Sequence, residues 1–277
     1  MQRNPRYNSQ HMNQMLPPIA AGGAEVYVWH LIHFSYGIGL FSLWLAKYRL
    51  PKLLQYGKTR QKKLVGVIEP WYTSIAVPRR YFSHFYVLSF VLATANLYWF
   101  PEDVITSCIF FHSLRRLVES ARVTKWGSES RMHAAHYLVG LWFYSVLNLS
   151  VYLQLNSRQR TRSPSTVNKV FGAVGAVGFL LASWDQARNH IHLAHMIKYT
   201  LPRRGLFKIV ACAHYFDEIV IYASLAAMEA TTRWSLTVAV IWVCANLGVS
   251  AVETKRYYDA KFKGQAVAPY ALIPYIM

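Results

Sequence analysis

Residues 24–47 read AEVYVWHLIHFSYGIGLFSLWLAK, a run in which most side chains are apolar or aromatic. A helix of about 20 mainly apolar residues is long enough to cross the hydrocarbon core of a bilayer. Inside that core an unpaired backbone N–H or C=O group is costly, so a spanning segment must be helical or belong to a closed barrel. The run therefore predicts a transmembrane helix.

Six more apolar stretches of similar length follow, and each of the last three has Trp or Tyr near at least one end. Such aromatic residues anchor helices at the membrane–water interface. The stretches cover residues 80–100, 102–120, 131–155, 166–197, 207–230 and 235–258. Together with 54% hydrophobic residues, they predict an all-α integral membrane protein, a bundle of about seven transmembrane helices.

The formal net charge of +18 would suggest a nucleic-acid partner in a soluble domain. Here the basic residues collect between the apolar stretches, which is typical of membrane orientation, so we expect no nucleic-acid partner. The first connection carries Lys47, Arg49, Lys52, Lys58, Arg60, Lys62 and Lys63. Because the second carries Glu102 and Asp103, we predict a lumenal amino terminus and a cytosolic carboxyl terminus. Arg158, Arg160 and Arg162 depart from this pattern.

The third stretch ends in HSLRRLVE, residues 112–119. An ionisable side chain inside the bilayer costs roughly 2.5 to 3.5 kcal/mol, so such groups usually face a cavity or one another. His112 and Arg116 are four residues apart, as are Arg115 and Glu119, so one helical face carries an imidazole, a guanidinium and a carboxylate. The alternative is an Arg–Glu ion pair that caps a helix at the membrane surface.

Two later stretches also carry many polar residues. The fifth contains Asp185, Gln186, Arg188, Asn189, His190, His192 and His195, and the sixth contains His214, Tyr215, Asp217 and Glu218. These residues are too numerous to face lipid, and they indicate a polar pocket. The alternative for the sixth stretch is a polar helix end at the interface.

Other motifs have simpler explanations. Gly172, Gly175 and Gly178 resemble a phosphate-binding loop, but no strand precedes them, so we interpret them as helix-packing residues. The eleven histidines offer too few paired sets for a di-metal centre, and we expect no metal. The three cysteines lie in apolar stretches and are interpreted as core residues.

Five motifs carry a resemblance to a known family. They are HSLRRLVE (112–119), YTLPRRGLF (199–207), His214-Tyr215 with Glu218, YYDAKF (257–262) and ALIP (271–274). In this order they resemble the steroid 5α-reductase family over most of the chain. YGKT (56–59) and VPRRYFSHFY (77–86) resemble its polyprenol reductase branch, which makes dolichol precursors in the endoplasmic reticulum.

The resemblance implies NADPH-dependent reduction of the α-isoprene double bond of a polyprenyl lipid, polyprenal or polyprenol, for protein N-glycosylation. It implies three parts of the chain: a polar tail (1–23), a lipid-substrate half (24–156) and an NADPH-binding half (157–277). The implied cofactor residues are Arg116, Gln186, His190, Tyr199, His214, Glu218 and Tyr258. Ser113 stands where the steroid-reducing members have a tyrosine that binds the substrate carbonyl, which argues against a steroid substrate.

Reduction of a conjugated double bond places negative charge on the carbonyl oxygen, and a hydrogen-bond donor must meet that oxygen. Our candidates are His112 as the donor and Glu119 as the group that orients His112 or Arg115; Glu69 and His84 come next. The alternatives are a steroid or enoyl-lipid reductase of the same family, an isoprenoid-handling membrane methyltransferase, and a transporter or receptor.

The predicted orientation can be tested with terminal tags in sealed microsomes. Added protease should digest a carboxyl-terminal tag and spare an amino-terminal one, because the basic first connection holds residues 47–63 in the cytosol. A protected carboxyl-terminal tag would overturn this assignment and place the expected NADPH site in the lumen.

Overall fold

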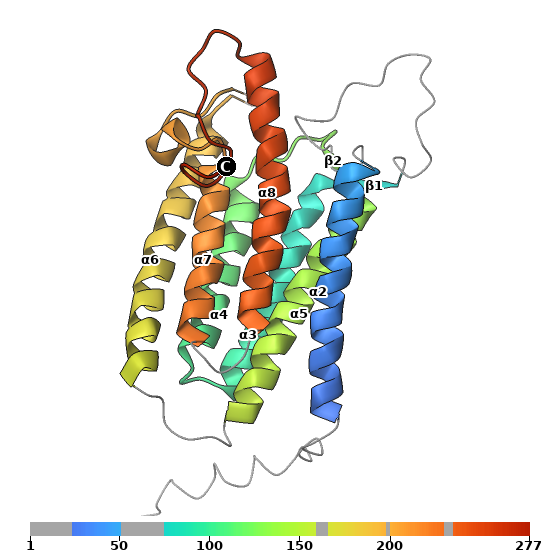
Figure 1. Cartoon of the computed structure of the whole chain (residues 1–277), viewed down its shortest axis with the longest axis vertical. Coiled ribbons are helices and arrows are strands. Elements are labelled where there is room, and N and C mark those ends of the chain that lie inside the picture. The colour runs from blue at the N-terminus through green and yellow to red at the C-terminus, as the bar shows by residue number, and fades with distance from the viewer. Residues whose placement is uncertain (1–23, 51–74, 159–165, 198–199, 230–234) are drawn as a thin grey trace, which may run out of the picture.

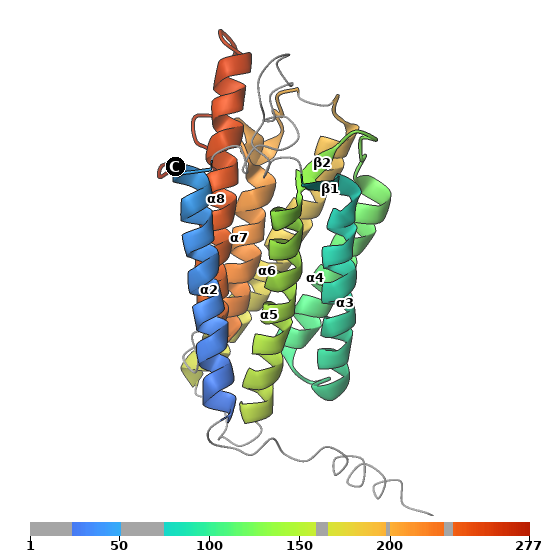
Figure 2. The same ribbon diagram turned by 90° about the vertical axis from the view of Figure 1, so that its right-hand side faces the viewer.

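The computed structural model describes residues 24–50, 75–158, 166–197, 200–229 and 235–277. The described residues form seven α-helices, which run side by side in Figures 1 and 2. They are α2 (Ala24–Tyr48), α3 (Phe82–Trp99), α4 (Val104–Val118), α5 (Ala134–Arg158), α6 (Thr166–His195), α7 (Ala213–Glu229) and α8 (Ser235–Lys261). The predicted helical bundle is therefore confirmed.

Four of these helices are long and apolar enough to cross a membrane. The candidate spans are Val26–Tyr48, Ala134–Asn156, Lys169–His195 and Ser235–Lys261, which lie in α2, α5, α6 and α8. The helices α3, α4 and α7 are shorter, with 18, 15 and 17 residues. The structure thus supports a membrane protein, and the count of seven crossings stays a prediction.

The start of α7 corrects the predicted stretch 207–230. Residues Gly205–Lys208 form a 3₁₀ helix, η7, and the backbone then pairs with the carboxyl-terminal tail. The Ala211 N–H donates to the Tyr270 carbonyl at 2.8 Å. Because this pairing satisfies the backbone groups that a helix would use, α7 begins only at Ala213.

A small sheet adds to the helices. Strands β1 (Ala76–Pro78) and β2 (Arg131–His133) pair antiparallel, with Val77 opposite Met132. Figure 1 places them at the upper end of the bundle, beside the ends of α2, α3 and α5. The helix α4 is extended at this end by a π-helical turn, η6 (Glu119–Val123). These short elements position the end of α4 that carries HSLRRLVE.

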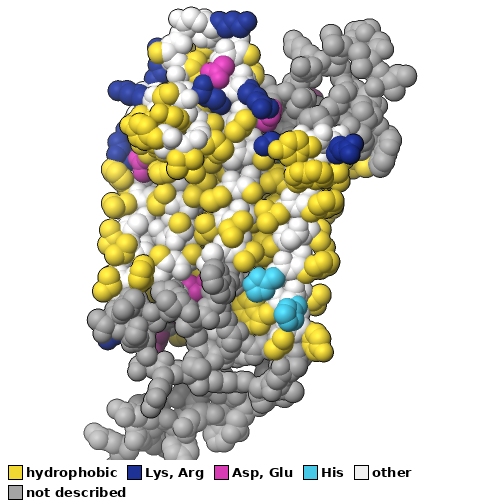
Figure 3. All heavy atoms as spheres, in the orientation of Figure 1, with side chains coloured by type: hydrophobic (Ala, Val, Ile, Leu, Met, Phe, Trp, Pro, Cys, Tyr) yellow, Lys and Arg dark blue, Asp and Glu magenta, His cyan; other side chains and the backbone are white. Residues whose placement is uncertain are grey.

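The helices alternate in direction, so α2, α4, α6 and α8 all end at the upper end of the bundle in Figures 1 and 2. Lys and Arg side chains gather at this end on the face in Figure 3, and hydrophobic side chains dominate the described surface below them. The connection around Arg160 and Arg162 lies outside the described residues. The orientation of this end in the membrane stays a prediction.

Two of the three glycines of α6 lie against α7. A Cβ atom added at Gly175 would lie 2.7 Å from the backbone oxygen of Ser224, and one at Gly178 would lie 2.7 Å from the Ser224 hydroxyl. At Gly172 an added Cβ would meet nothing within 4 Å. Small residues let these two helices approach closely, as expected for Gly175 and Gly178 but not for Gly172.

Gly175→Ala should destabilise the bundle, because its methyl group would push against the backbone of α7. We expect a loss of about 1–3 kcal/mol, the usual cost of overpacking. Gly172→Ala is the matched control, since its methyl group enters open space. Thermal unfolding in detergent measures both. Equal melting temperatures for the two variants would contradict the close packing of α6 on α7.

Candidate functional site

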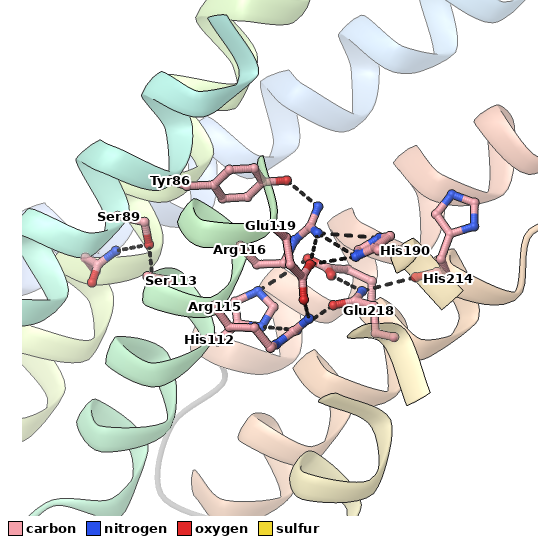
Figure 4. A network of polar contacts seen from close by, with 12 residues as sticks. Tyr86, Ser89, His112, Ser113, Arg115, Arg116, Glu119, His190, His214 and Glu218 are labelled. Carbon is pink, nitrogen blue, oxygen red and sulfur yellow. Dashed lines mark hydrogen bonds and ion pairs between the residues drawn. The ribbon is translucent and has the colours of Figure 1, made fainter. Parts of the chain in front are cut away.

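A buried carboxylate lies at the end of α4, within a polar network (Figure 4). Glu119 is 5% exposed and accepts hydrogen bonds from two guanidinium groups of its own helix. Arg115 Nη1 donates to Oε1 and Arg116 Nη1 donates to Oε2, each at 2.6 Å. The spacings of four and three residues bring both arginines to the same carboxylate. Glu119 therefore neutralises positive charge at the centre of the network.

The helix α6 contributes two residues from one face. His190 Nδ1 lies 2.7 Å from Glu119 Oε2 and 2.8 Å from Arg116 Nη1. Arg115 Nη2 donates to Gln186 Oε1 at 2.6 Å. Since Gln186 and His190 are one helical turn apart, α6 meets both arginines through a single face.

The helix α7 adds a second carboxylate. Gln186 Nε2 donates to Glu218 Oε2 and also to the His214 carbonyl at 3.1 Å. His112 Nε2 lies 3.6 Å from Glu218 Oε1, and His112 Nδ1 lies 3.3 Å from Arg115 Nη2. The imidazole of His112 is therefore placed between a carboxylate of α7 and a guanidinium of α4.

The helix α3 completes the network through Tyr86. Arg116 Nη2 donates to the Tyr86 hydroxyl at 2.6 Å, and the guanidinium carbon lies 4.8 Å from the centre of the Tyr86 ring. Two guanidinium charges, on Arg115 and Arg116, face two carboxylates, on Glu119 and Glu218. This balance matters because an unpaired buried charge is strongly destabilising.

The structure brings together seven of the nine residues singled out from the sequence. These are His112, Arg116, Glu119, Gln186, His190, His214 and Glu218. The His214 ring lies beside the His190 ring, with centroids 5.7 Å apart. Tyr258 is buried, and its ring lies 5.9 Å from the Phe262 ring between centroids. Tyr199 lies outside the described residues.

The partners within the network differ from one sequence expectation. Glu119 contacts Arg115, as expected, but the carboxylate beside His112 is Glu218 of α7. This pairing depends on how α4 and α7 pack, which the helical spacing of HSLRRLVE cannot reveal. Sequence reasoning also missed the bond of Tyr86 to Arg116, because an aromatic residue in an apolar helix gives no sign of a polar partner.

Ser113 also lies in a different setting from the expected one. Its side chain is fully buried, and its hydroxyl lies 2.7 Å from the Ser89 hydroxyl on α3. Asn148 Nδ2 of α5 donates to Ser89 at 3.4 Å. Ser113 thus belongs to the contact between α3 and α4. Of the two reserve candidates, Glu69 is outside the described residues, and the exposed His84 lies 3.0 Å from the Tyr137 hydroxyl.

Comparisons with known proteins agree on one family. The family described as 3-oxo-5-alpha-steroid 4-dehydrogenase matches residues 131–277, which include α5 to α8. A polyprenal reductase of Saccharomyces cerevisiae is 44% identical over 255 residues, covering 91% of this chain and 96% of its own. A polyprenal reductase of Danio rerio is 25% identical over 304 residues, covering 90% of this chain and 97% of its own. Polyprenal reductase 1 of Oryza sativa subsp. indica is 27% identical over 282 residues, covering 72% of this chain and 79% of its own.

Glu119→Gln should destabilise the protein by about 3–5 kcal/mol, because it removes one partner of a buried ion pair. Glu253→Gln is a matched control. Glu253 pairs with Arg256 at 2.9 Å, an arginine likewise three residues away but on the other side in sequence, and both side chains are much more exposed. An exposed pair contributes roughly 0.2–1 kcal/mol. Denaturation in detergent compares the variants, and an equal loss in both would refute the structural role of Glu119.

Proposed function

The chain belongs to the 3-oxo-5-alpha-steroid 4-dehydrogenase family, and on this basis we propose that it reduces the α-isoprene double bond of polyprenal. The reaction is an oxidoreduction of a carbon–carbon bond, and its product leads to dolichol, the lipid carrier for protein N-glycosylation. The observation that carries the proposal is the 44% identity with the yeast polyprenal reductase over nearly the whole of both chains.

The aldehyde is the favoured substrate over the alcohol for a chemical reason. When hydride adds to a double bond conjugated with a carbonyl, the developing charge moves onto the carbonyl oxygen, where hydrogen-bond donors can stabilise it. Polyprenol has no carbonyl to accept that charge. The long isoprenoid lies among the apolar side chains of α2 to α5, and its polar end reaches the network at the end of α4.

The residues of the network fit NADPH. The cofactor supplies the hydride when bound, while the protein positions the cofactor and the substrate and excludes water. Arg115 Nε and Arg116 Nε are buried and have no hydrogen-bond partner among the described residues, so both remain available to an acceptor such as a carboxamide oxygen. Exposed cations on the same end of the bundle, Arg188, Arg204 and Lys208, are suited to the phosphate groups.

The network residues divide into those that bind NADPH and those that act on the substrate. Arg116, Gln186, His190, His214 and Glu218 hold the nicotinamide end of NADPH, and Tyr199 and Tyr258 contact the rest of the cofactor. His112, held between Arg115 and Glu218, donates to the substrate. Glu119 acts through Arg115 and is a positioning residue.

The proposed location is the endoplasmic reticulum membrane, with residues 24–156 binding the lipid and residues 157–277 binding NADPH on the cytosolic side. A steroid reductase of the same family is the nearest alternative. This chain has Ser113 where the steroid-reducing members have a tyrosine, so it has no phenol there that could bind a steroid carbonyl. The Ser113 hydroxyl instead lies against Ser89 inside the α3–α4 contact. A methyltransferase would share the isoprenoid pocket but would not bind NADPH.

Purified protein reconstituted in nanodiscs tests the proposal directly. With NADPH, polyprenal should gain two hydrogen atoms, as measured by lipid mass spectrometry, whereas polyprenol and a steroid enone should remain unchanged. Reduction of the steroid enone alone would favour the steroid alternative. Failure to bind NADPH would contradict the proposed function and leave the methyltransferase or a transporter.

Two substitutions in α4 separate cofactor binding from turnover. Arg116→Ala should weaken NADPH binding by about 1.5–3 kcal/mol, since it removes a charge-assisted contact. Glu119→Gln should lower turnover far more than NADPH affinity, because it releases Arg115 beside His112. Calorimetric titration and kcat, measured below the melting temperature of each variant, check both. Arg256→Ala, at an exposed pair, serves as the control.

A further inference from the structure

Two buried phenol groups remain outside the network just described. Tyr36 of α2 is 1% exposed and Tyr222 of α7 is 2% exposed. The Tyr36 hydroxyl has no hydrogen-bond partner within the described ranges, and the Tyr222 hydroxyl has only Tyr144 beside it, without a hydrogen bond of regular geometry. Neither takes part in the mechanism above. Leaving a polar group unpaired in an apolar surrounding is costly. Such a cost indicates that something else meets these hydroxyls.

Consecutive residues of α5 hold the two tyrosines near the centre of the bundle. The Tyr36 ring packs edge-on against Trp142, with centroids 5.2 Å apart, and the Tyr222 ring packs against Phe143 at 5.6 Å. Because Trp142 and Phe143 are adjacent in the chain, α5 brings Tyr36 of α2 and Tyr222 of α7 to the same level of the bundle. The surroundings are aromatic and apolar, which makes hydrogen bonds formed there strong.

Tyr222 also connects this region with the site. Its ring lies edge-on to the His112 ring, with centroids 6.0 Å apart, and it interacts electrostatically with Glu218. Tyr222 therefore lies beside the His112–Glu218 pair, and Tyr36 lies across α5 from it at the same level, where an isoprenoid chain would approach the network.

We propose that the Tyr36 and Tyr222 hydroxyls bind the aldehyde oxygen of the polyprenyl substrate; this inference rests on the proposed function. Among the described residues the Tyr36 hydroxyl has no acceptor, and the Tyr222 hydroxyl has only the Tyr144 hydroxyl beside it, whereas an aldehyde oxygen is an acceptor that donates nothing. A neutral phenol is also suited to this depth, because it brings no charge into the apolar centre. The pair supplies the donors that Ser113, bonded to Ser89, does not offer.

The chemistry requires donors at this oxygen. Hydride addition to the β-carbon breaks the π bond of the double bond and moves an electron pair onto the aldehyde oxygen, giving an enolate. A proton from water then adds to the α-carbon and restores the carbonyl. NADPH is the reductant, and the tyrosines change neither oxidation state nor covalent bonds. Their hydrogen bonds strengthen as charge develops on the oxygen.

Tyr222→Phe and Tyr36→Phe test the proposal, since each removes one hydroxyl and keeps the ring. We expect Tyr222→Phe to lower kcat by roughly 10²–10³-fold, the usual effect of losing one such donor. Polyprenal binding, followed by tryptophan quenching without NADPH, should weaken about tenfold in each variant, whereas an isoprenoid hydrocarbon of equal length should bind as before. NADPH affinity should not change.

Tyr152→Phe is the matched control. It makes the same change on α5, where the ring packs against Phe100, away from the two phenols. If Tyr222→Phe and Tyr36→Phe weaken polyprenal and hydrocarbon binding equally, the two tyrosines have only a packing role and the proposal is overturned. The proposal is also overturned if the kcat values of these two variants equal that of Tyr152→Phe. Should Tyr222→Phe fail to fold, Tyr36→Phe alone decides by the same binding comparison. A wild-type protein that reduces no polyprenal would instead overturn the proposed function.

Discussion

The rest of the structure depends on the neutralisation of two guanidinium groups that α4 carries into the bundle. Arg115 and Arg116 cannot face lipid, and Glu119 alone cannot balance both charges. The helices α6 and α7 therefore meet α4 with Gln186, His190 and Glu218, and α3 meets it with Tyr86. This requirement fixes which faces of four helices point inward, and it concentrates ionisable groups at one end of an otherwise apolar core.

The same requirement explains how the two halves of the chain depend on one another. Residues 24–156 supply Arg115, Arg116 and Glu119, and residues 157–277 supply Gln186, His190 and Glu218. Neither set is electrically balanced without the other. This junction has charged groups on one side and aromatic rings such as Tyr222 and Phe143 on the other. Such an arrangement suits a substrate with one polar end and a long apolar chain.

The sequence predicted the helices well, because apolar length is a local property that a bilayer demands of each spanning segment. The start of α7 and the β1–β2 pairing could not be predicted, since both depend on backbone contacts between distant segments, such as Ala211 with Tyr270. Polar residues in apolar stretches identified most of the network. The pairing of His112 with Glu218 depends on helix packing, and Tyr36, Tyr86 and Tyr222 look like ordinary apolar or interfacial aromatics in a sequence.

The most direct test of the central claim is the position of deuterium in the product. Polyprenal is incubated with purified protein and NADPH deuterated on either face of nicotinamide C4, and the lipid is analysed by mass spectrometry and NMR. The account predicts that one of the two cofactors gives one deuterium on the β-carbon of the α-isoprene unit, with the aldehyde retained. Deuterium on the aldehyde carbon with the double bond intact would contradict it.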